Sequence, residues 1–194
     1  SLPLTLFALL LTAGCMNLGS IAAPAYSLGE NSRLHFDADR GKLEFNESGV
    51  DSTVPDAAAK KIFFKGQGGR VSGILWLPEK GPRKKPAVVY LPGALVGKEA
   101  GAGYAKLLAA GGIAVFSLDQ PGVGETDYKF NAFEDDFRAF ENGEMTSQYD
   151  YFFDAMRAFD YLAQRGDVDS ARIMVAGESM GGRGRDDVAQ ADDE

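Results

Sequence analysis

The sequence predicts an α/β protein in which a mostly parallel sheet follows an antiparallel N-terminal hairpin. Three continuous apolar runs, at 87–91, 113–118 and 172–176, have the pattern of strands buried on both faces. Two segments with helical periodicity, at 103–110 and 146–165, separate these runs. Because helical crossovers join parallel strands, the alternation predicts strand, helix, strand, helix, strand in one parallel sheet.

The hairpin precedes the parallel strands. Residues 60–65 and 70–78 are rich in β-branched, aromatic and aliphatic side chains. They flank the glycine-rich segment 66–69, which is typical of a hairpin turn. The sequence therefore predicts two antiparallel strands at the start of the sheet.

Both predicted helices have clear ends. The helix at 103–110 ends before the glycine pair 111–112, and the helix at 146–165 ends before Gly166. The aromatic and aliphatic stripe of the second helix predicts a face packed on the core. Phenylalanines among acidic residues at 130–143 predict a further short helix over the carboxyl edge of the sheet.

Composition excludes several classes of protein. With 194 residues, 45% of them hydrophobic and 25% charged, the chain is neither fibrous, nor wholly disordered, nor a multi-span membrane protein. The 28 acidic and 20 basic residues give a net charge of -8, which argues against nucleic acid as a partner. Cys15 is the only cysteine, which excludes an internal disulfide and a zinc site with several thiolates.

The N-terminal segment has the features of an export signal. Residues 2–13 form an uncharged apolar run that is too short to span a bilayer. The run ends in Leu-Thr-Ala-Gly-Cys, which resembles a bacterial lipoprotein signal and implies lipidation of Cys15. We therefore expect a signal at 1–15, a membrane contact through the lipid at Cys15, and export to the cell envelope, with Met16 favouring the outer membrane. The alternative is that Cys15 lies buried in an N-terminal hydrophobic helix.

Residues 16–57 are expected to form a tether and N-terminal extension. The stretch after Cys15 is low in charge and rich in Ala, Ser, Gly and Asn, which is typical of a flexible linker. The expected domain organisation then continues with the α/β core at 58–182 and an atypical charged tail at 183–194.

Polar and glycine-rich loops follow all three buried strands. They contain Pro92-Gly93-Ala94, the segment 119–125, and Gly-Glu-Ser-Met-Gly-Gly at 177–182. Sites in open parallel sheets lie beyond the carboxyl ends of the strands, so these loops are expected to meet. The last loop contains a G-x-S-x-G motif, in which small residues let the chain turn sharply from strand to helix beside a nucleophilic Ser179.

Residues 58–182 resemble the first half of an α/β-hydrolase. The motifs at 77–78, 119–125 and 177–182 are similar to those of bacterial esterases and dienelactone-hydrolase-like enzymes. The resemblance implies that Ser179 is the nucleophile and that the backbone N–H groups of Met180 and Ala94 bind the oxyanion. It further implies a small ester or acyl substrate, an acyl-enzyme intermediate, and no metal or organic cofactor.

The chain departs from the family pattern in three places. Pro92-Gly93 stands where many relatives have His-Gly. Asp119 and Glu125 do not occupy the position of the family's catalytic acid and are expected to be structural residues of their loop. No His follows the G-x-S-x-G motif, and His35 precedes the core, where a surface or packing role is expected. The tail 183–194 lacks an apolar stripe, so we expect an amino-terminal piece of a longer hydrolase that is inactive by itself.

Other functions are compatible with parts of the sequence. A serine peptidase of the same fold and a non-catalytic, lipid-anchored hydrolase-like protein are the alternatives to an esterase. A phosphate-binding loop at 93–98 is excluded, because one residue is missing between the glycines and Glu99 stands where Ser or Thr is required.

Overall fold

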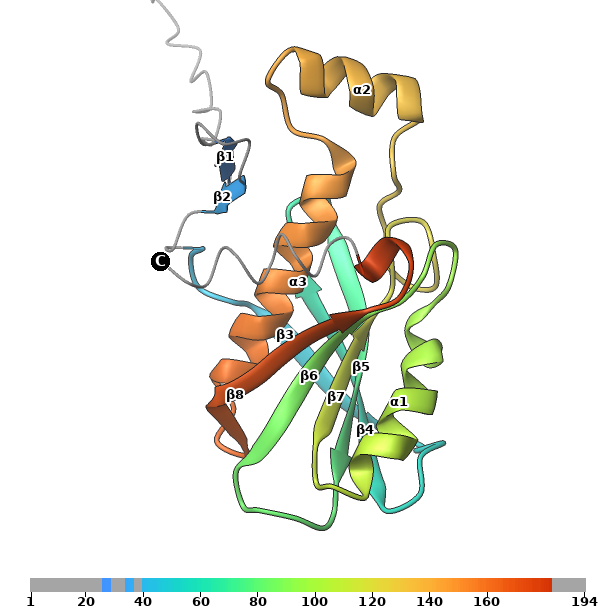
Figure 1. Ribbon diagram of the computed structural model, residues 1–194, viewed down its shortest axis with the longest axis vertical. Helices are drawn as coiled ribbons and strands as arrows, with labels where there is room; N and C mark the ends of the chain where they lie inside the picture. The colour runs from blue at the N-terminus through green and yellow to red at the C-terminus, as the bar shows by residue number, and fades with distance from the viewer. Residues whose placement is uncertain (1–25, 29–33, 37–39, 183–194) are drawn as a thin grey trace, which may run out of the picture.

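A six-stranded mixed sheet forms the centre of the protein (Figure 1). The computed structural model describes residues 26–28, 34–36 and 40–182. The strands of this sheet lie in the order β3-β4-β5-β7-β6-β8. In chain order their bounds are β3 (Phe45–Val50), β4 (Ala57–Lys65), β5 (Arg70–Pro78), β6 (Lys85–Leu91), β7 (Ala114–Leu118) and β8 (Val168–Gly177).

The pairing confirms the predicted hairpin and parallel strands. β4 and β5 pair antiparallel from Ala57↔Pro78 to Lys65↔Arg70. β6 pairs in parallel with both β7 and β8. β5 pairs antiparallel with β7, with Gly73 opposite Leu118. The start of β5 and the carboxyl end of β7 therefore lie at the same edge of the sheet.

The sheet begins upstream of residue 58. β3 lies inside the segment 16–57 that was expected to be a tether and extension, and it pairs antiparallel with β4 from Phe45↔Phe64 to Val50↔Ala59. Most of its side chains are exposed, so no apolar pattern marks it in the sequence. Two further short strands, β1 (Tyr26–Leu28) and β2 (Leu34–Phe36), form a separate two-stranded sheet.

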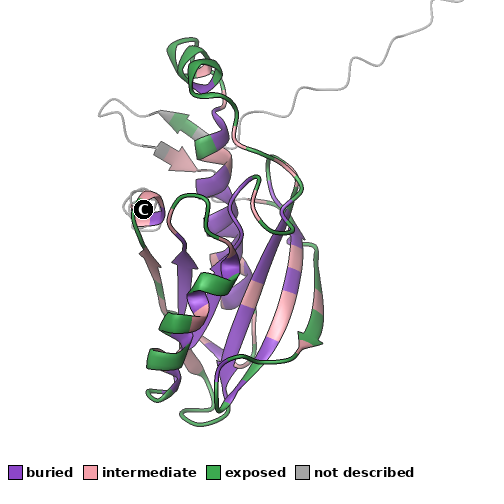
Figure 2. Cartoon of the chain, turned by 90° about the vertical axis from the view of Figure 1, so that its right-hand side faces the viewer, coloured by how far each residue is buried: buried purple, intermediate pink, exposed green. Residues whose placement is uncertain are grey.

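Helices cover both faces of the six-stranded sheet (Figures 1 and 2). α1 (Gly101–Ala109) follows the short 3-10 helix η1 (Lys98–Ala100) on one face, and α3 (Ser147–Ala163) lies on the other. Thr146 caps α3, because its hydroxyl accepts the Tyr149 N–H at 3.3 Å. Both helices match the predicted segments to within two residues at each end.

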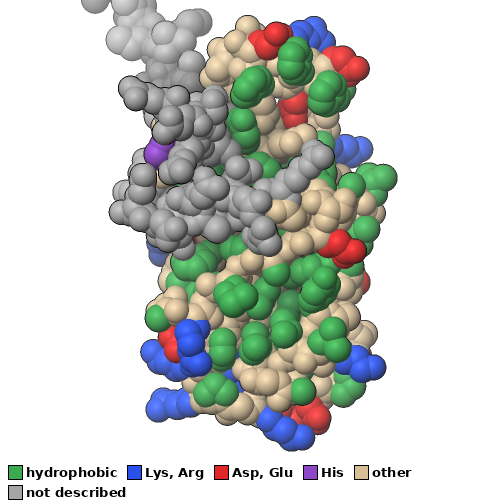
Figure 3. Space-filling view, viewed as in Figure 1, with side chains coloured by type: hydrophobic (Ala, Val, Ile, Leu, Met, Phe, Trp, Pro, Cys, Tyr) green, Lys and Arg blue, Asp and Glu red, His purple; other side chains and the backbone are tan. Residues whose placement is uncertain are grey.

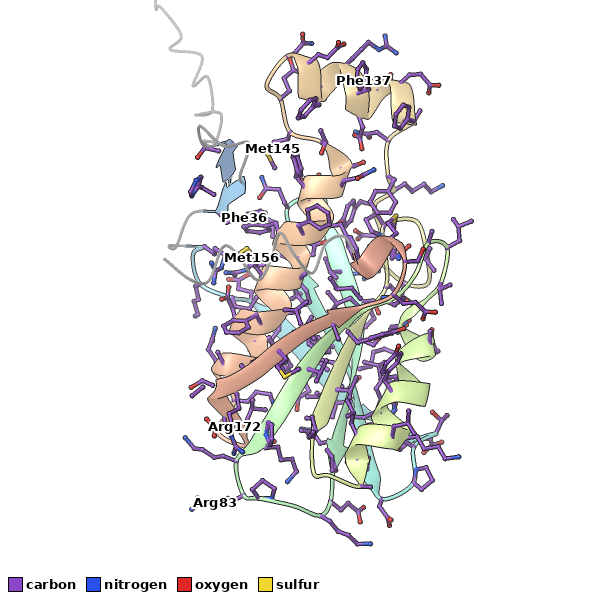
Figure 4. All side chains as sticks on the ribbon, viewed as in Figure 1. Phe36, Arg83, Phe137, Met145, Met156 and Arg172 are labelled. Atoms are coloured by element: carbon purple, nitrogen blue, oxygen red, sulfur yellow. The ribbon has the colours of Figure 1, made fainter. Side chains whose placement is uncertain are left out.

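The larger core lies between the sheet and α3. Met156 on this helix is 2% exposed (Figure 4), and it packs in one cluster with Ile62, Val89 and Phe116, all at 0% exposure. Burying one such aliphatic or aromatic side chain contributes about 1.5–3 kcal/mol. The α3 face of the sheet is thus buried, and a second cluster that contains Val115 and part of α1 buries the opposite face. β6 and β7 are therefore covered on both faces, which explains their unbroken apolar runs.

The segment 130–143 contains the predicted short helix, α2 (Phe133–Glu141). It lies beyond the N-terminal end of α3, toward the end of the molecule where the parallel strands terminate (Figure 1). Asp136 ties it to α3, because its carboxylate accepts the Ser147 N–H at 3.0 Å and the Ser147 hydroxyl at 2.6 Å. The rest of α2 faces solvent, and Phe137, labelled in Figure 4, is 49% exposed.

In the described chain, β8 has a neighbouring strand on one side only, namely β6. The prediction that the run 172–176 is buried on both faces was wrong, because none of its residues is buried in this strand at the side of the sheet. Met174 on β8 is 65% exposed, and Leu107 on α1 is 76% exposed. Figure 3 shows hydrophobic side chains gathered across β8 and toward α1. None of the helices in the described residues is long and apolar enough to cross a membrane.

Candidate active site

The loops after β6, β7 and β8 meet at one edge of the sheet. Leu91 at the end of β6 is the register partner of Gly177 at the end of β8, and Tyr90 is the partner of Ser117 on β7. A Cβ placed on Gly93 would lie 3.5 Å from the Cβ of Ser179. The structure therefore places the loop at 92–94 beside the predicted nucleophile.

Ser179 has the backbone conformation of a nucleophile elbow. Its φ is 54°, a left-handed value that is uncommon for a residue with a side chain and costs about 1–3 kcal/mol. The hydroxyl-bearing residue is exposed to solvent. Strain of this kind persists only where the surrounding structure enforces it, and here the hydrogen bond from the Glu178 N–H to Leu91 and the close backbone packing at Gly177 and Gly181 do so.

The two glycines of the motif are required by close backbone approach. A Cβ on Gly177 would lie 2.2 Å from the carbonyl oxygen of Gly181. A Cβ on Gly181 would lie 2.1 Å from the carbonyl oxygen of Leu91. No side chain fits at either position, which is the physical reason for the G-x-S-x-G spacing.

Hydrogen bonds attach the elbow to β6. The Glu178 N–H donates to the Leu91 carbonyl at 3.1 Å, and the Tyr90 hydroxyl donates to Glu178 Oε2 at 3.0 Å. Burial and the neighbouring Glu178 carboxylate raise the pKa of Tyr90, so its phenol stays protonated and remains a donor. The residue before Ser179 is thus held through both its backbone and its side chain.

Two backbone N–H groups beside the elbow are available to an oxyanion. Met180 lies in the first turn of a helix, where N–H groups have no intrahelical acceptor. Ala94 lies in a turn closed by the Val96 N–H, which donates to the Gly93 carbonyl at 3.2 Å. Within the described residues, neither the Met180 nor the Ala94 N–H has a hydrogen-bond partner. The structure tests neither assignment further, and both stay predictions.

Asp119 organises the loop after β7 from inside the protein. Its side chain is 0% exposed, and its carboxylate accepts the Lys98 N–H at 2.8 Å, the Lys98 ammonium at 2.7 Å and the Glu125 N–H at 2.9 Å. A Cβ on Gly124, whose φ is +60°, would lie 2.3 Å from Asp119 Oδ2. These contacts agree with the expected structural role of Asp119.

Lys98 is the buried cation of this loop cluster. Its side chain is 2% exposed and also lies 3.0 Å from Glu125 Oε2. Burial lowers its pKa, but hydrogen bonds to Asp119 and Glu125 outweigh burial, so the pKa lies above the usual lysine value. An ammonium enclosed by carboxylates cannot reach a phosphate in solvent, in agreement with the exclusion of a phosphate-binding loop.

Gln120 is a residue that the sequence analysis did not single out. It is 1% exposed, and its side-chain amide contacts the turn after β6 through three hydrogen bonds. The only signal in the sequence is an uncharged polar residue two positions after the end of a buried strand, which is a weak signal. Its partners lie 25–28 residues away in the chain, so sequence spacing does not reveal them.

Other predicted residues lie away from the elbow or outside the described chain. His35 lies on β2 in the separate two-stranded sheet, as expected for a residue outside the core. Cys15 and the tail 183–194 lie outside the described residues. Among residues 26–28, 34–36 and 40–182, no group of three His, Cys, Asp or Glu side chains is placed to hold a metal ion.

Solved esterase structures share this fold. Acetyl xylan esterase from Paenibacillus sp. R4 superposes with a TM-score of 0.66 at 20% identity, covering 79% of this chain and 52% of that protein. Acetyl xylan esterase 1 from Thermoanaerobacterium sp. JW/SL YS485 gives 0.63 at 20% identity, covering 78% and 50%. Glucuronoyl esterase from Solibacter usitatus gives 0.62 at 16% identity, covering 87% and 52%. The chain spans about half the length of these proteins.

The fold is therefore that of the α/β-hydrolase esterases, as the motifs predicted. No curated protein sequence matches the chain. A family model described as acetyl xylan esterase (AXE1) matches residues 35–185, a range that includes the whole six-stranded sheet and the elbow. The chain belongs to the acetyl xylan esterase (AXE1) family.

Proposed function

We propose that this chain carries the nucleophile of a serine carboxylic-ester hydrolase. The observation that supports the proposal most directly is Ser179, an exposed serine held at φ 54° between two glycines that admit no side chain. An elbow of this geometry presents the hydroxyl to a substrate and aims the following helix N-terminus at the developing negative charge.

The reaction follows from the groups at the edge of the sheet. The Ser179 oxygen attacks the ester carbonyl, and the negative oxygen that forms accepts hydrogen bonds from the Met180 and Ala94 N–H groups. The C–O bond to the alcohol then breaks, and the alcohol takes up the proton that a general base removed from the Ser179 hydroxyl. Water then hydrolyses the acyl-enzyme to the free acid and restores the Ser179 hydroxyl. We infer that the general base and its orienting acid come from parts of the full-length protein outside the described residues.

Acetyl esters of carbohydrates are the substrate class that the proposal favours. The support is the family itself and the esterases with which the chain superposes, whose names describe action on acetyl xylan or glucuronoyl esters. We expect the full-length protein to hydrolyse acetylated xylo-oligosaccharides and 4-nitrophenyl acetate faster than the corresponding hexanoate.

A fluorophosphonate probe tests the nucleophile in the full-length protein. We expect it to label the wild type and the Ser170→Ala variant, and to fail with Ser179→Ala. Ser170 is a suitable control because it is also exposed but lies near the start of β8, at the other end of the strand from the elbow, and its φ is not positive. Equal labelling after Ser179→Ala, or a wild type that hydrolyses no ester, would show that the proposal is wrong.

We also propose that the protein is an exported bacterial lipoprotein of the cell envelope, anchored through lipid on Cys15. The support is the apolar run and the Leu-Thr-Ala-Gly-Cys ending alone. Incorporation of labelled palmitate into the wild type but not into Cys15→Ser, with loss of the variant from the membrane fraction, is the expected result. Equal incorporation into both proteins would refute the anchor.

A further inference from the structure

We infer that Gln120 is a positioning residue for the oxyanion turn, the segment 93–96 that follows β6. The inference rests on the proposed esterase function and adds to it a residue that holds one oxyanion donor in place. Gln120 contacts neither substrate nor Ser179 in this scheme. It acts through the backbone of the turn that presents the Ala94 N–H.

The Gln120 side chain forms hydrogen bonds with three backbone groups of the oxyanion turn and the residue before it. Gln120 Nε2 donates to the Pro92 carbonyl at 2.6 Å and to the Gly93 carbonyl at 2.8 Å. Gln120 Oε1 accepts the Leu95 N–H at 3.2 Å. The Ala94 peptide lies between these anchored groups, so its N–H direction is set by bonds on both sides.

The turn needs such an anchor because its backbone is strained. Leu95 has a φ of 62°, and its side chain is 87% exposed, so packing of the side chain does not hold this conformation. Left-handed conformations of residues with a Cβ persist only where the surroundings enforce them. The described contacts that enforce this conformation are the hydrogen bond from the Val96 N–H to the Gly93 carbonyl, which closes the turn, and the three hydrogen bonds between the turn and the Gln120 side chain.

Only a carboxamide satisfies this arrangement. The turn offers two carbonyl acceptors and one N–H donor toward the side chain, and an amide supplies two N–H donors and an oxygen acceptor. A carboxylate would place negative charge against two carbonyl oxygens and near the site where the oxyanion forms. An aliphatic side chain would leave the Pro92 carbonyl and the Leu95 N–H without their described partner, whereas the Gly93 carbonyl would keep the Val96 N–H.

The test compares Gln120→Leu and Gln120→Asn with the wild-type full-length protein. We expect Gln120→Leu to lower kcat for 4-nitrophenyl acetate by about 10–100-fold, less than the roughly 100–1,000-fold loss seen when an oxyanion donor is itself removed. KM should change less than about threefold, because the ground-state ester is bound without the oxyanion contact. Gln120→Asn, which keeps the amide on a shorter side chain, should lie between Gln120→Leu and the wild type.

The affinity for a trifluoromethyl ketone distinguishes a positioning role of Gln120 from a role in stability alone. This inhibitor forms an oxyanion adduct with the serine, so its affinity should fall by the same factor as kcat in each variant. Thr126→Val is the matched control. The Thr126 hydroxyl is buried in the same loop and accepts the Ser72 N–H at 3.1 Å, but it contacts neither the turn nor the elbow. We expect this control to lower the melting temperature and to leave kcat and inhibitor affinity unchanged.

The outcomes distinguish this inference from the proposed function. A wild type without turnover or Ser179 labelling overturns the proposed function, and the inference with it. An active wild type whose Gln120→Leu variant keeps its kcat and inhibitor affinity overturns the inference alone. A loss of inhibitor affinity equal to that of Thr126→Val also overturns it. If Gln120→Leu does not fold, the same comparison with Gln120→Asn decides, and an unchanged kcat and inhibitor affinity in that variant refutes the inference.

Discussion

Replacing Lys98 with Met tests the buried ion pair beneath the loops of the site. The Lys98 ammonium lies 2.7 Å from Asp119 Oδ2, with the two side chains 2% and 0% exposed. Met fills similar volume but leaves the carboxylate with two backbone donors, the Lys98 and Glu125 N–H groups. Breaking a buried pair by removing one partner costs about 3–5 kcal/mol. That loss is a large fraction of an ordinary unfolding free energy of about 5–15 kcal/mol.

Urea denaturation of the full-length protein measures this loss from the shift in midpoint at constant m. Lys61→Met is the matched control, because Lys61 lies 2.9 Å from Glu125 Oε2 in a pair whose side chains are 31% and 43% exposed. Exposed pairs contribute about 0–1 kcal/mol, so the control should remain close to the wild type. If the two variants lose equal stability, the reasoning from desolvation is refuted.

Two further substitutions test the elbow and the attachment of β3. Gly181→Ala should abolish ester hydrolysis and Ser179 labelling, because its Cβ would lie 2.1 Å from the Leu91 carbonyl oxygen, whereas Gly103→Ala, with open space around its Cβ, should keep both. Burial raises the pKa of Glu47, but hydrogen bonds from Lys60, Tyr161 and Arg165 outweigh it and hold the pKa at about 2, below the unfolded value of 4.5. Glu47 therefore stabilises the fold above pH 4.5 and loses this effect as the pH falls toward 2. Glu47→Gln should lower the unfolding free energy by about 1 kcal/mol at pH 7, an effect limited by solvent screening. At pH 2 the substitution should cause no measurable change in the unfolding free energy. A loss in chemical denaturation that is equal at both pH values would contradict this explanation.

The elements with strong local patterns were predicted correctly. The hairpin, the buried runs of β6 and β7 and the stripe of α3 all follow from side-chain periodicity and from glycines at the ends. β3 was missed, because its Phe-Asn-Glu-Ser-Gly-Val sequence is mostly exposed and alternates weakly. β3 is a strand because it pairs with the edge of β4, with Phe45 opposite Phe64. β4 comes later in the chain, so the local sequence of β3 does not reveal this pairing.

The residues of the site also differ in whether a local sequence pattern predicts them. Ser179 was predicted because the requirement for small residues at Gly177 and Gly181 is local and leaves a readable spacing. The ion pair of Lys98 with Asp119 was not predicted, because the two residues are 21 positions apart and both are of types that are common on surfaces. Gln120 was not singled out for the same reason.

The sequence by itself determined the strands and helices from β4 onward and where the chain can make a strained elbow. These properties depend on backbone preferences and side-chain periodicity over a few neighbouring residues. The tertiary structure decided that β7 lies between β5 and β6, and that β3 closes the far edge of the sheet. It also decided which polar side chains are buried against the turn after β6. Strand order and burial arise from contacts between distant segments, and no local pattern encodes the identity of those partners.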